Sequence, residues 1–214
     1  MELRDSVCLV TGASSGIGRA VAQTLIARGA VVAVSARRLP ALQELGAASV
    51  HAADLSDPAH ALTLAAEVEA RHGRVDVLVN NAGVRIDAAV SEIGLNELDR
   101  SFQVNALSPF VLCGQLVGGM LGRGTGVIVN VEAPAVTGGR RGMGAYAASK
   151  AALSALTQTL RTEVGGGRGV AVFGFDPGWV RTPLAPDGPG EPEAAAERLV
   201  GHIMAGRSSR TPLD

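Results

Sequence analysis

Tyr146 and Lys150 are the two residues of this chain whose types and spacing most clearly allow proton chemistry. Tyr146 is the only tyrosine in 214 residues, and Lys150 is the only lysine. Both lie in AYAASKAAL at 145–153, a helix-like segment in which residues i and i+4 share one face. A phenol there could exchange a proton beside an ammonium that stabilises its anion. The alternative is a core tyrosine next to a solvated lysine.

The turn TGASSGIG at 11–18 has the composition of a phosphate-binding loop. It joins an apolar, strand-like run to a helical pattern, and its glycines let the backbone turn tightly and approach a ligand. Free N–H groups at the start of the helix could then bind a pyrophosphate. The spacing G-x-x-x-G-x-G makes this a variant of the common dinucleotide fingerprint. The predicted contacts are Gly12, Ser14, Ser15, Gly16, Ile17 and Gly18.

The same turn also contains G-x-S-x-G, the nucleophile elbow of an α/β-hydrolase, at Gly12, Ser14 and Gly16. In that class the elbow follows several strands, whereas this turn follows the first predicted strand. A serine hydrolase is therefore the alternative class, and the dinucleotide site is preferred. The histidines, none of which has an obvious partner carboxylate in the sequence, are His51, His60, His72 and His202.

The end of the second predicted strand reads SARR, and its charges indicate which dinucleotide would bind. NAD sites place an acidic residue about 20 residues after the glycines, whereas an arginine there suits a 2′-phosphate. Here Ala36 offers no carboxylate, and Arg37 and Arg38 offer two cations. The sequence favours NADP(H) as the cofactor, the alternative being that both arginines are simply solvated.

Short apolar runs alternate with longer helical patterns along the chain, and this order predicts the fold. Strands that are apolar on both faces, alternating with helices, are typical of a parallel sheet covered on each side. We expect a single α/β domain over 1–214, a Rossmann-type doubly wound parallel sheet with helices on both faces. The expected strands are 6–12, 30–37, 49–55, 75–83, 126–131 and 170–178, and the expected helices are 17–29, 40–46, 58–73, 95–121, 145–164 and about 193–204.

Composition narrows the classes of function. The formal net charge is −1 and the arginines are scattered, which argues against a nucleic-acid partner. Cys8 and Cys113 are isolated, so we expect reduced thiols in a cytoplasmic protein, and no metal site is predicted. The N-terminus lacks the layout of a signal peptide, and no apolar run is expected to approach the length of a membrane span.

Six motifs in order make the chain resemble the short-chain dehydrogenase/reductase family over residues 5 to about 183. Any one of them could arise by chance, but six in sequence form a specific signal. The motifs are TGASSGIG at 11–18, DL at 54–55, NNAG at 80–83, Asn105 within FQVNALSPF, YAASK at 146–150 and PGWVRT at 177–182.

The resemblance implies hydride transfer between NADP(H) and a small carbonyl or alcohol substrate. Tyr146 would exchange the proton with the substrate oxygen, and Lys150 would hold the nicotinamide ribose and lower the pKa of the tyrosine. Asn105 would kink its helix and hold a water that relays protons to Lys150. The other implied cofactor contacts are Asp54 at the adenine edge with its neighbour Leu55, Asn81, Ala82 and Gly83 on the adenosine side, and Pro177, Gly178, Val180 and Thr182 at the nicotinamide end.

The first departure from the family pattern is at its catalytic serine, thirteen positions before the tyrosine, where this chain has Ala133 preceded by Glu132. Alanine cannot donate a hydrogen bond to the substrate oxygen, and losing one such donor typically costs roughly 10²- to 10³-fold in rate. Glu132 is expected at the surface or mouth of the site, unless it replaces the serine in a different reaction. An alternative function is therefore an NADP(H)-binding protein that catalyses a non-redox, isomerase- or cyclase-like reaction or acts as a non-catalytic partner.

The second departure is the C-terminal region. A Pro/Gly-rich loop at about 183–192 stands where the family has a helical substrate lid. A helix and polar tail at 193–214 follow, without a clear final strand of the kind that often builds a tetramer interface in the family. We expect a more open site and a homodimer, for which the alanine-rich stretch 145–155 would suit close helix packing.

Overall fold

The computed structural model of the protein describes residues 1–133, 139–165 and 169–206. Its centre is a six-stranded sheet in the order β3-β2-β1-β4-β5-β6, and every neighbouring pair is parallel. The predicted α/β fold with a doubly wound parallel sheet is confirmed. The strands are β1 (Val7–Thr11), β2 (Val31–Ala36), β3 (Ser49–Ala52), β4 (Val77–Asn80), β5 (Gly126–Val131) and β6 (Val170–Phe175).

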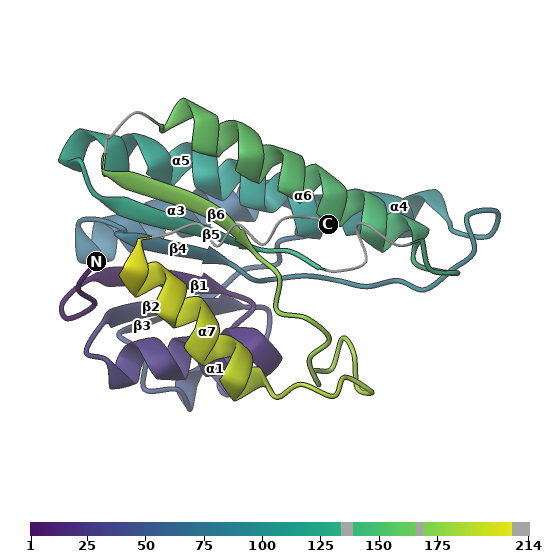
Figure 1. Ribbon diagram of the computed structural model, residues 1–214, viewed down its shortest axis with the longest axis horizontal. Coiled ribbons are helices and arrows are strands. Elements are labelled where there is room, and N and C mark those ends of the chain that lie inside the picture. Colours follow the sequence, from purple (N-terminus) through teal and green to yellow (C-terminus); the bar gives the residue numbers. More distant parts are fainter. Residues whose placement is uncertain (134–138, 166–168, 207–214) are drawn as a thin grey trace.

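Helices cover both faces of the sheet, and α1 and α7 lie side by side on one of them (Figure 1). Alternate residues of a strand point to opposite faces, so Val10 packs in the core under α1 and α7, whereas Leu9 packs under α3 and α5. This is why the strands are apolar throughout. The helices are α1 (Gly16–Ala27), α2 (Leu39–Gln43), α3 (Pro58–His72), α4 (Leu95–Phe102), α5 (Ser108–Arg123), α6 (Gly144–Glu163) and α7 (Pro192–Ala205).

The helix predicted over 95–121 is interrupted in its middle. Between α4 and α5 the chain forms a π-helical segment, η1 (Gln103–Leu107), which contains Asn105. Such segments occur mostly as single-turn bulges and are frequent at functional sites. The expected distortion at Asn105 is therefore present, as a change in helical hydrogen bonding.

The continuous stretch Leu95–Arg123 is 29 residues long and, by length and composition alone, apolar enough to cross a membrane. This corrects the expectation that no apolar run approaches such a length. Of its most apolar window, 44% is buried inside the protein, and α5 packs against α3 and β5. Its apolar character is that of a helix that contributes to the core.

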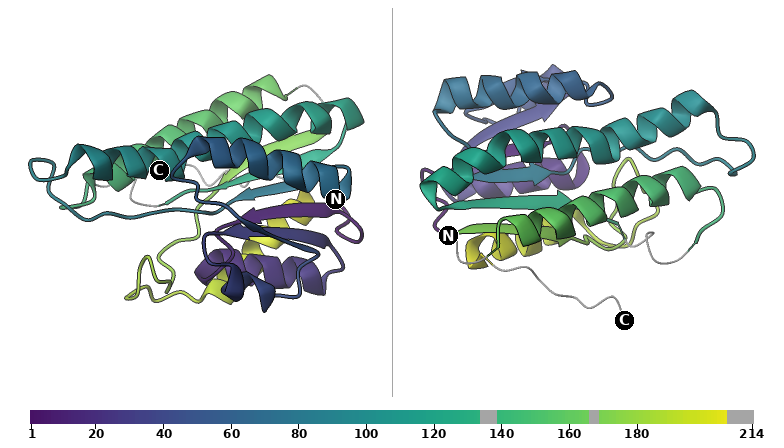
Figure 2. Two further views of the ribbon diagram at one scale, coloured as in Figure 1. Left: turned by 180° about the vertical axis from the view of Figure 1, so that it is seen from behind. Right: turned by 90° about the horizontal axis from the view of Figure 1, so that it is seen from above.

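The carboxyl ends of the strands form the edge at which the predicted motifs meet. After β1 the chain continues to β2 on one side of β1, and after β4 it continues to β5 on the other side. The loops that follow β1 and β4 therefore diverge, and a crevice opens between them. The loop after β6 reaches the same end of the molecule as the loop after β4 (Figure 2).

The predicted loop at about 183–192 is a compact turn, in which Val180 pairs with Gly190 and Thr182 with Ala185. A Cβ added to Gly188 would lie 2.3 Å from the carbonyl carbon of Val180, so the two backbones are in close contact. Within the described residues no strand follows β6. Positions 207–214 of the predicted tail lie outside them.

Candidate active site

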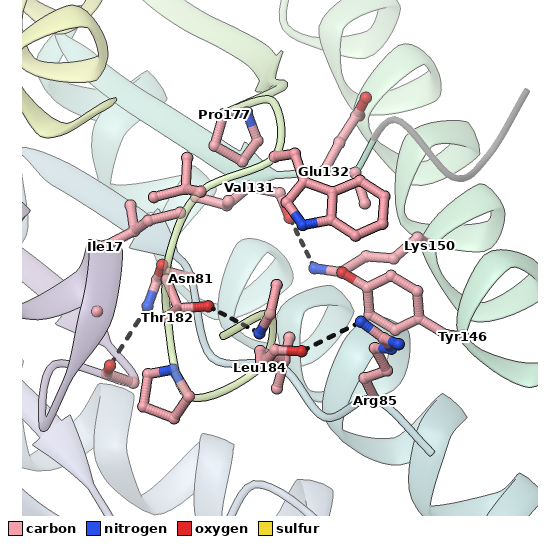
Figure 3. A pocket seen from close by; sticks show the side chains of 18 of the residues that line it. Ile17, Asn81, Arg85, Val131, Glu132, Tyr146, Lys150, Pro177, Thr182 and Leu184 are labelled. Atoms are coloured by element: carbon pink, nitrogen blue, oxygen red, sulfur yellow. Dashed lines mark hydrogen bonds between the residues drawn. The ribbon is translucent and has the colours of Figure 1, made fainter. Parts of the chain in front are cut away.

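A pocket at the carboxyl ends of the strands brings together segments that are far apart in the sequence. The glycine turn after β1, the loop after β4, the end of β5, the start of α6 and the loop after β6 all contribute to its walls. Tyr146 and Lys150 point into it from α6 (Figure 3). The predicted site residues that line it are Gly12, Ser15, Gly16, Ile17, Asn81, Gly83, Tyr146, Lys150, Pro177, Gly178, Val180 and Thr182.

A second pocket adjoins the first and shares Gly12, Ser15 and Gly83 with it. Of the predicted residues, only Gly18 and Asn105 line neither pocket, and both are buried behind the walls. The predicted residues found in this second pocket are Ser14, Arg37, Arg38, Asp54, Leu55 and Ala82.

The glycines of the turn allow it to pack directly on the loop after β4. A Cβ built on Gly18 would lie 2.3 Å from the Asn81 side-chain nitrogen, and one on Gly12 would lie 2.7 Å from the Cα of Ala82. The Nδ2 of Asn81 donates to the carbonyl oxygen of Thr11 at 2.9 Å. Gly18 therefore serves packing between the two loops, and Asn81 holds the turn in place while it lines the first pocket.

The N-terminus of α1 is directed at the pocket and has no competing anion. Ser15 is the N-cap residue, with an extended backbone and no side-chain cap hydrogen bond, and the first turn contains no acidic residue. The first N–H groups of a helix have no partner within the helix and carry its positive end. They are suited to bind a phosphate.

Three arginines line the second pocket, namely Arg37, Arg38 and Arg100. Arg100 was not predicted as a site residue, since it lies on α4 and only the fold brings it into the same pocket as the end of β2. Burial acts to raise the pKa of Asp54, but hydrogen bonds from Ser56 and the charges of Arg37 and Arg100 together lower it. The Asp54 carboxylate is thus held as an anion among cations.

Lys150 is buried, with 3% of its surface exposed, and its Nζ donates to the carbonyl oxygen of Val131 at 2.7 Å. Burial lowers the pKa of Lys150 to about 8, although the charge of Glu132 acts to raise it. Burial raises the pKa of Tyr146 to about 12, while the nearby charge of Arg85 acts to lower it.

The direction found for Tyr146 is opposite to the lowering expected from Lys150. The reason is that burial penalises the phenolate more strongly than the cations of the protein stabilise it. At neutral pH the tyrosine is therefore a protonated phenol, which is the form that donates a proton. The lysine, with a pKa near 8, exchanges protons close to neutral pH.

Asn105 is fully buried in η1, and its side chain joins the loop after β4 to α6. Its Oδ1 accepts from the N–H of Val84 at 2.8 Å, and its Nδ2 donates to the carbonyl oxygen of Val84 at 2.8 Å. The same Nδ2 donates to the Oγ of Ser149 at 2.9 Å. These bonds give Asn105 a positioning role, because they hold the loop against the helix that carries Tyr146 and Lys150.

Ala133 lies at the end of β5 and lines the first pocket. Glu132 also borders the pocket, but its carboxylate lies over β6, where a Cβ on Gly174 would be 2.3 Å from the Glu132 Oε1. Burial raises the pKa of Glu132, whereas hydrogen bonds from Thr157 and Ser154 act to lower it. Glu132 is therefore a partly buried residue with hydrogen-bond partners on α6, and not a solvated surface carboxylate.

Three further residues of the first pocket were not singled out from the sequence, namely Arg85, Arg140 and Trp179. Arg85 follows the NNAG motif by two positions and lies beside Tyr146 (Figure 3). The guanidinium of Arg140 lies over the ring of Trp179, 4.1 Å from the centroid. The sequence offers one signal for two of them: Arg85 follows a family motif closely, and Trp179 lies inside the motif PGWVRT.

The hydrolase alternative has no site among the described residues, because no histidine lines the pocket that contains Ser14. One histidine does have a carboxylate partner that the sequence did not reveal. The Nδ1 of His51 lies 2.9 Å from the Glu67 Oε2, and its Nε2 lies 2.9 Å from the Oγ of Ser49. This group connects β3 with α3 and lines neither pocket.

Comparison with known proteins shows the family to which the chain is similar. A sequence profile described as short chain dehydrogenase matches residues 6–189. The 3-oxoacyl-[acyl-carrier-protein] reductase FabG of Thermotoga maritima is 33% identical over 215 residues, which cover 97% of this chain and 86% of that protein.

Two solved structures with bound dinucleotides are similar over nearly the whole chain. A metagenomic short-chain oxidoreductase in complex with NADP is 31% identical with a TM-score of 0.85, covering 99% of this chain and 95% of the other. The 3-ketoacyl-(acyl-carrier-protein) reductase from Brucella melitensis complexed with NADH is 26% identical with a TM-score of 0.85, covering 94% and 91%. Since the profile and the relatives span most of its length, the chain belongs to the short-chain dehydrogenase/reductase family and is an oxidoreductase.

Proposed function

We propose that the protein uses NADP(H) to transfer a hydride between the nicotinamide and a small carbonyl or alcohol substrate. The observation that carries this proposal is the placement of Tyr146 and Lys150 in one pocket with the glycine turn and Thr182. A proton-transfer pair and a phosphate-binding turn on a shared cavity are what such a reaction requires.

The residues present fit a dinucleotide. The glycine turn would be blocked by added Cβ atoms, and the open N-terminus of α1 supplies N–H donors for a pyrophosphate. Asp54 and Leu55 would border the adenine in the second pocket, and Asn81 to Gly83, which lie between the two pockets, would line the adenosine side. Pro177, Gly178, Val180 and Thr182 would hold the nicotinamide end, with its ribose near Tyr146 and Lys150.

The preference for NADP(H) over NAD(H) rests on the charges of this chain. Related structures contain either NADP or NADH, so the family alone does not decide between them. In this protein Ala36 stands at the end of β2, and Arg37, Arg38 and Arg100 surround the adjoining pocket. Three cations favour the additional phosphate of NADP(H).

Tyr146 and Lys150 in the first pocket, and Asn105 behind its wall, each have a definite task in carbonyl reduction. When bound, NADPH supplies the hydride. Tyr146 donates its phenolic proton to the substrate oxygen as negative charge develops there, and its raised pKa keeps that proton in place beforehand. Lys150, held by the Val131 carbonyl, stabilises the resulting phenolate with its charge. Asn105 acts indirectly, by fixing the loop after β4 against α6.

Ala133 is the observation that favours a second candidate, a family member that binds NADP(H) without net redox chemistry. Calorimetry with NADPH and NADH, combined with NADPH consumption over a panel of ketones and quinones, separates the two. Our proposal expects NADPH binding and consumption with at least one carbonyl compound. Firm NADPH binding without consumption by any of them would support the non-redox candidate.

We further propose that the protein is a cytoplasmic homodimer. Exposed small side chains on α6 would allow a second copy to approach closely, and Cys8 and Cys113 are buried free thiols, as a reducing compartment permits. Light scattering coupled to gel filtration measures the mass directly, and a monomer would contradict the dimer. The exposed alanines are Ala148, Ala151, Ala152 and Ala155.

A further inference from the structure

The first pocket lacks the hydrogen-bond donor that the family has at position 133, and it contains a donor, Arg85, to which no role has yet been assigned. Under the proposed function, on which this inference rests, the substrate oxygen needs a second hydrogen bond besides that from Tyr146. Ala133 at the end of β5 cannot supply it. Lys150 donates one N–H to Val131, and its proposed role is to stabilise the phenolate of Tyr146, while Asn81 donates to Thr11. Arg85, on the loop after β4, also lines the pocket.

Arg85 is held in a fixed orientation and retains free donors. Its Nε donates to the Oδ1 of Asp87 at 2.8 Å and its Nη2 to the Oδ2 at 2.6 Å, a bidentate pair. Its Nη1 donates to the carbonyl oxygen of Leu184 at 3.3 Å. A guanidinium has five N–H groups, so these contacts, counted over the described residues, leave one N–H on each of Nη1 and Nη2.

Arg85 lines the same pocket as the residue that transfers the proton and lies close to it. Figure 3 shows its guanidinium next to the ring of Tyr146. The two groups also affect each other electrostatically: the charge of Arg85 acts to lower the pKa of Tyr146, and a tyrosinate acts to raise the pKa of Arg85. An atom that accepts the proton of Tyr146 would therefore lie in the field of Arg85.

The pairing with Asp87 argues against a binding site for a substrate carboxylate. Asp87 occupies the bidentate edge formed by Nε and Nη2, and its negative charge offsets the positive charge that would attract a second carboxylate. The side chain of Arg85 is 24% exposed, so it is partly shielded from water. A fixed, partly buried N–H donor suits an oxygen that gains charge during the reaction.

We infer that Arg85 donates to the substrate oxygen the hydrogen bond that Ala133 cannot, and so is a catalytic residue for carbonyl reduction. The carbonyl carbon takes up the hydride, with both its electrons, from NADPH, which becomes NADP⁺. The carbonyl oxygen takes up the proton of Tyr146. Arg85 keeps all its protons and stabilises the charge on the oxygen while the proton moves.

The test is a double-mutant cycle on hydride transfer with NADPH. Arg85→Met should lower kcat by about 10²-fold in the Ala133 protein, the usual effect of losing one preorganised donor. In the Ala133→Ser background, where the hydroxyl supplies a donor, the loss should shrink to about tenfold or less. An equal loss in both backgrounds, or no loss in either, would overturn the inference.

Two substrates separate this role from carboxylate binding. Ethyl acetoacetate is neutral, whereas acetoacetate carries a carboxylate on the same ketone. A donor to the ketone oxygen should affect kcat for both to a similar extent, and a rise in KM confined to acetoacetate would show a carboxylate anchor instead. Arg28→Met is the matched control, because Arg28 is also ion-paired, with Glu197, and lines neither pocket.

The protein could reduce neither ethyl acetoacetate nor acetoacetate, and that outcome would count against the proposed function. A measurement that does not depend on activity then still tests the inference about Arg85. With tyrosine labelled by carbon-13 at Cζ, the single tyrosine gives one resonance. At pH 7, Arg85→Met should shift this resonance, because it removes the charge beside the ring, and Arg28→Met should leave it unchanged. An unchanged resonance in Arg85→Met would show that Arg85 does not lie beside Tyr146. Circular dichroism confirms the fold, and if Arg85→Met unfolds, Arg85→Gln removes the same charge and should also shift the resonance.

Discussion

The Nζ of Lys150 donates to the carbonyl oxygen of Val131, 2.7 Å away, and this bond ties α6 to the end of β5. Lys150 is therefore a buried cation whose hydrogen-bond partner is a backbone oxygen. Burial lowers its pKa from 10.5 to about 8, so the folded protein holds this proton less tightly than the unfolded chain does. At neutral pH this buried cation thus reduces the stability of the fold.

Replacing this lysine by an apolar residue should stabilise the protein. The shift in pKa corresponds to about 3 kcal/mol at pH 7, below both pKa values, and the lost hydrogen bond offsets about 1 kcal/mol of it. Lys150→Met should therefore raise the free energy of unfolding by about 2 kcal/mol at pH 7 while carbonyl reduction falls to background. As pH rises from 8 to 10.5, the wild type regains stability and the difference should narrow, as urea unfolding at several pH values will measure. A variant less stable than the wild type at pH 7 would contradict this account.

Tyr146→Phe retains the buried ring and removes the phenolic hydroxyl. NADPH should still bind with an affinity close to that of the wild type, because the residues of the glycine turn are unchanged. Carbonyl reduction should fall to near background, since the proton donor is lost. Calorimetry and NADPH consumption measure the two properties separately. Reduction at more than about a tenth of the wild-type rate would show that another group supplies the proton.

The three arginines of the second pocket should decide the choice of cofactor. NADPH should bind at least about tenfold more tightly than NADH, as one charge-assisted contact to a phosphate is worth about 1.5–3 kcal/mol. Arg37→Ala should remove most of this preference, and Arg100→Ala should reduce it. Arg28→Ala, outside both pockets, is the control for a general change in charge. Calorimetry with both cofactors gives the preference of each of the four proteins, and equal binding of both cofactors by the wild type would refute the assignment.

Gly18 and Gly201 form a matched pair for testing the glycine turn. Each lies in a helix, but a Cβ on Gly18 would be 2.3 Å from the Asn81 side-chain nitrogen, whereas one on Gly201 would meet no atom within 4 Å. Gly18→Ala should displace Asn81, weaken NADPH binding by at least about tenfold and lower the melting temperature. Gly201→Ala should leave binding unchanged and raise stability by up to about 1 kcal/mol. Similar behaviour of the two variants would show that the turn tolerates a side chain.

Ala133→Ser restores the donor that the family pattern has at this position. Reduction of an activated ketone should rise by about tenfold, less than a preorganised donor can supply, because Arg85 already serves the oxygen in part. NADPH consumption by the two proteins under identical conditions measures the change. Absence of reduction in both, with firm NADPH binding, would favour the non-redox candidate.

The fold followed from the sequence because its signals are local and repeated. Strands apolar on both faces, such as SVCLVTG and GVIVNV, require a sheet that is covered on each side, and a parallel order follows from the helices between them. The boundaries were less accurate at 95–121, where the helix is interrupted by the π-helical segment that contains Asn105. The Asn105 side chain bonds to Val84 and Ser149, which are distant in the sequence, and no local pattern reveals such contacts.

The motif residues of the site were also readable from the sequence, since their spacing within one turn or one helix places them together. What only the tertiary structure decided is which other side chains face them. Arg100 joins Arg37, and Arg85 joins Tyr146, across loops that no local pattern connects. The protonation of the site was decided in the same way: the helix spacing brought Lys150 near Tyr146, but burial, a property of the whole fold, sets the pKa of each.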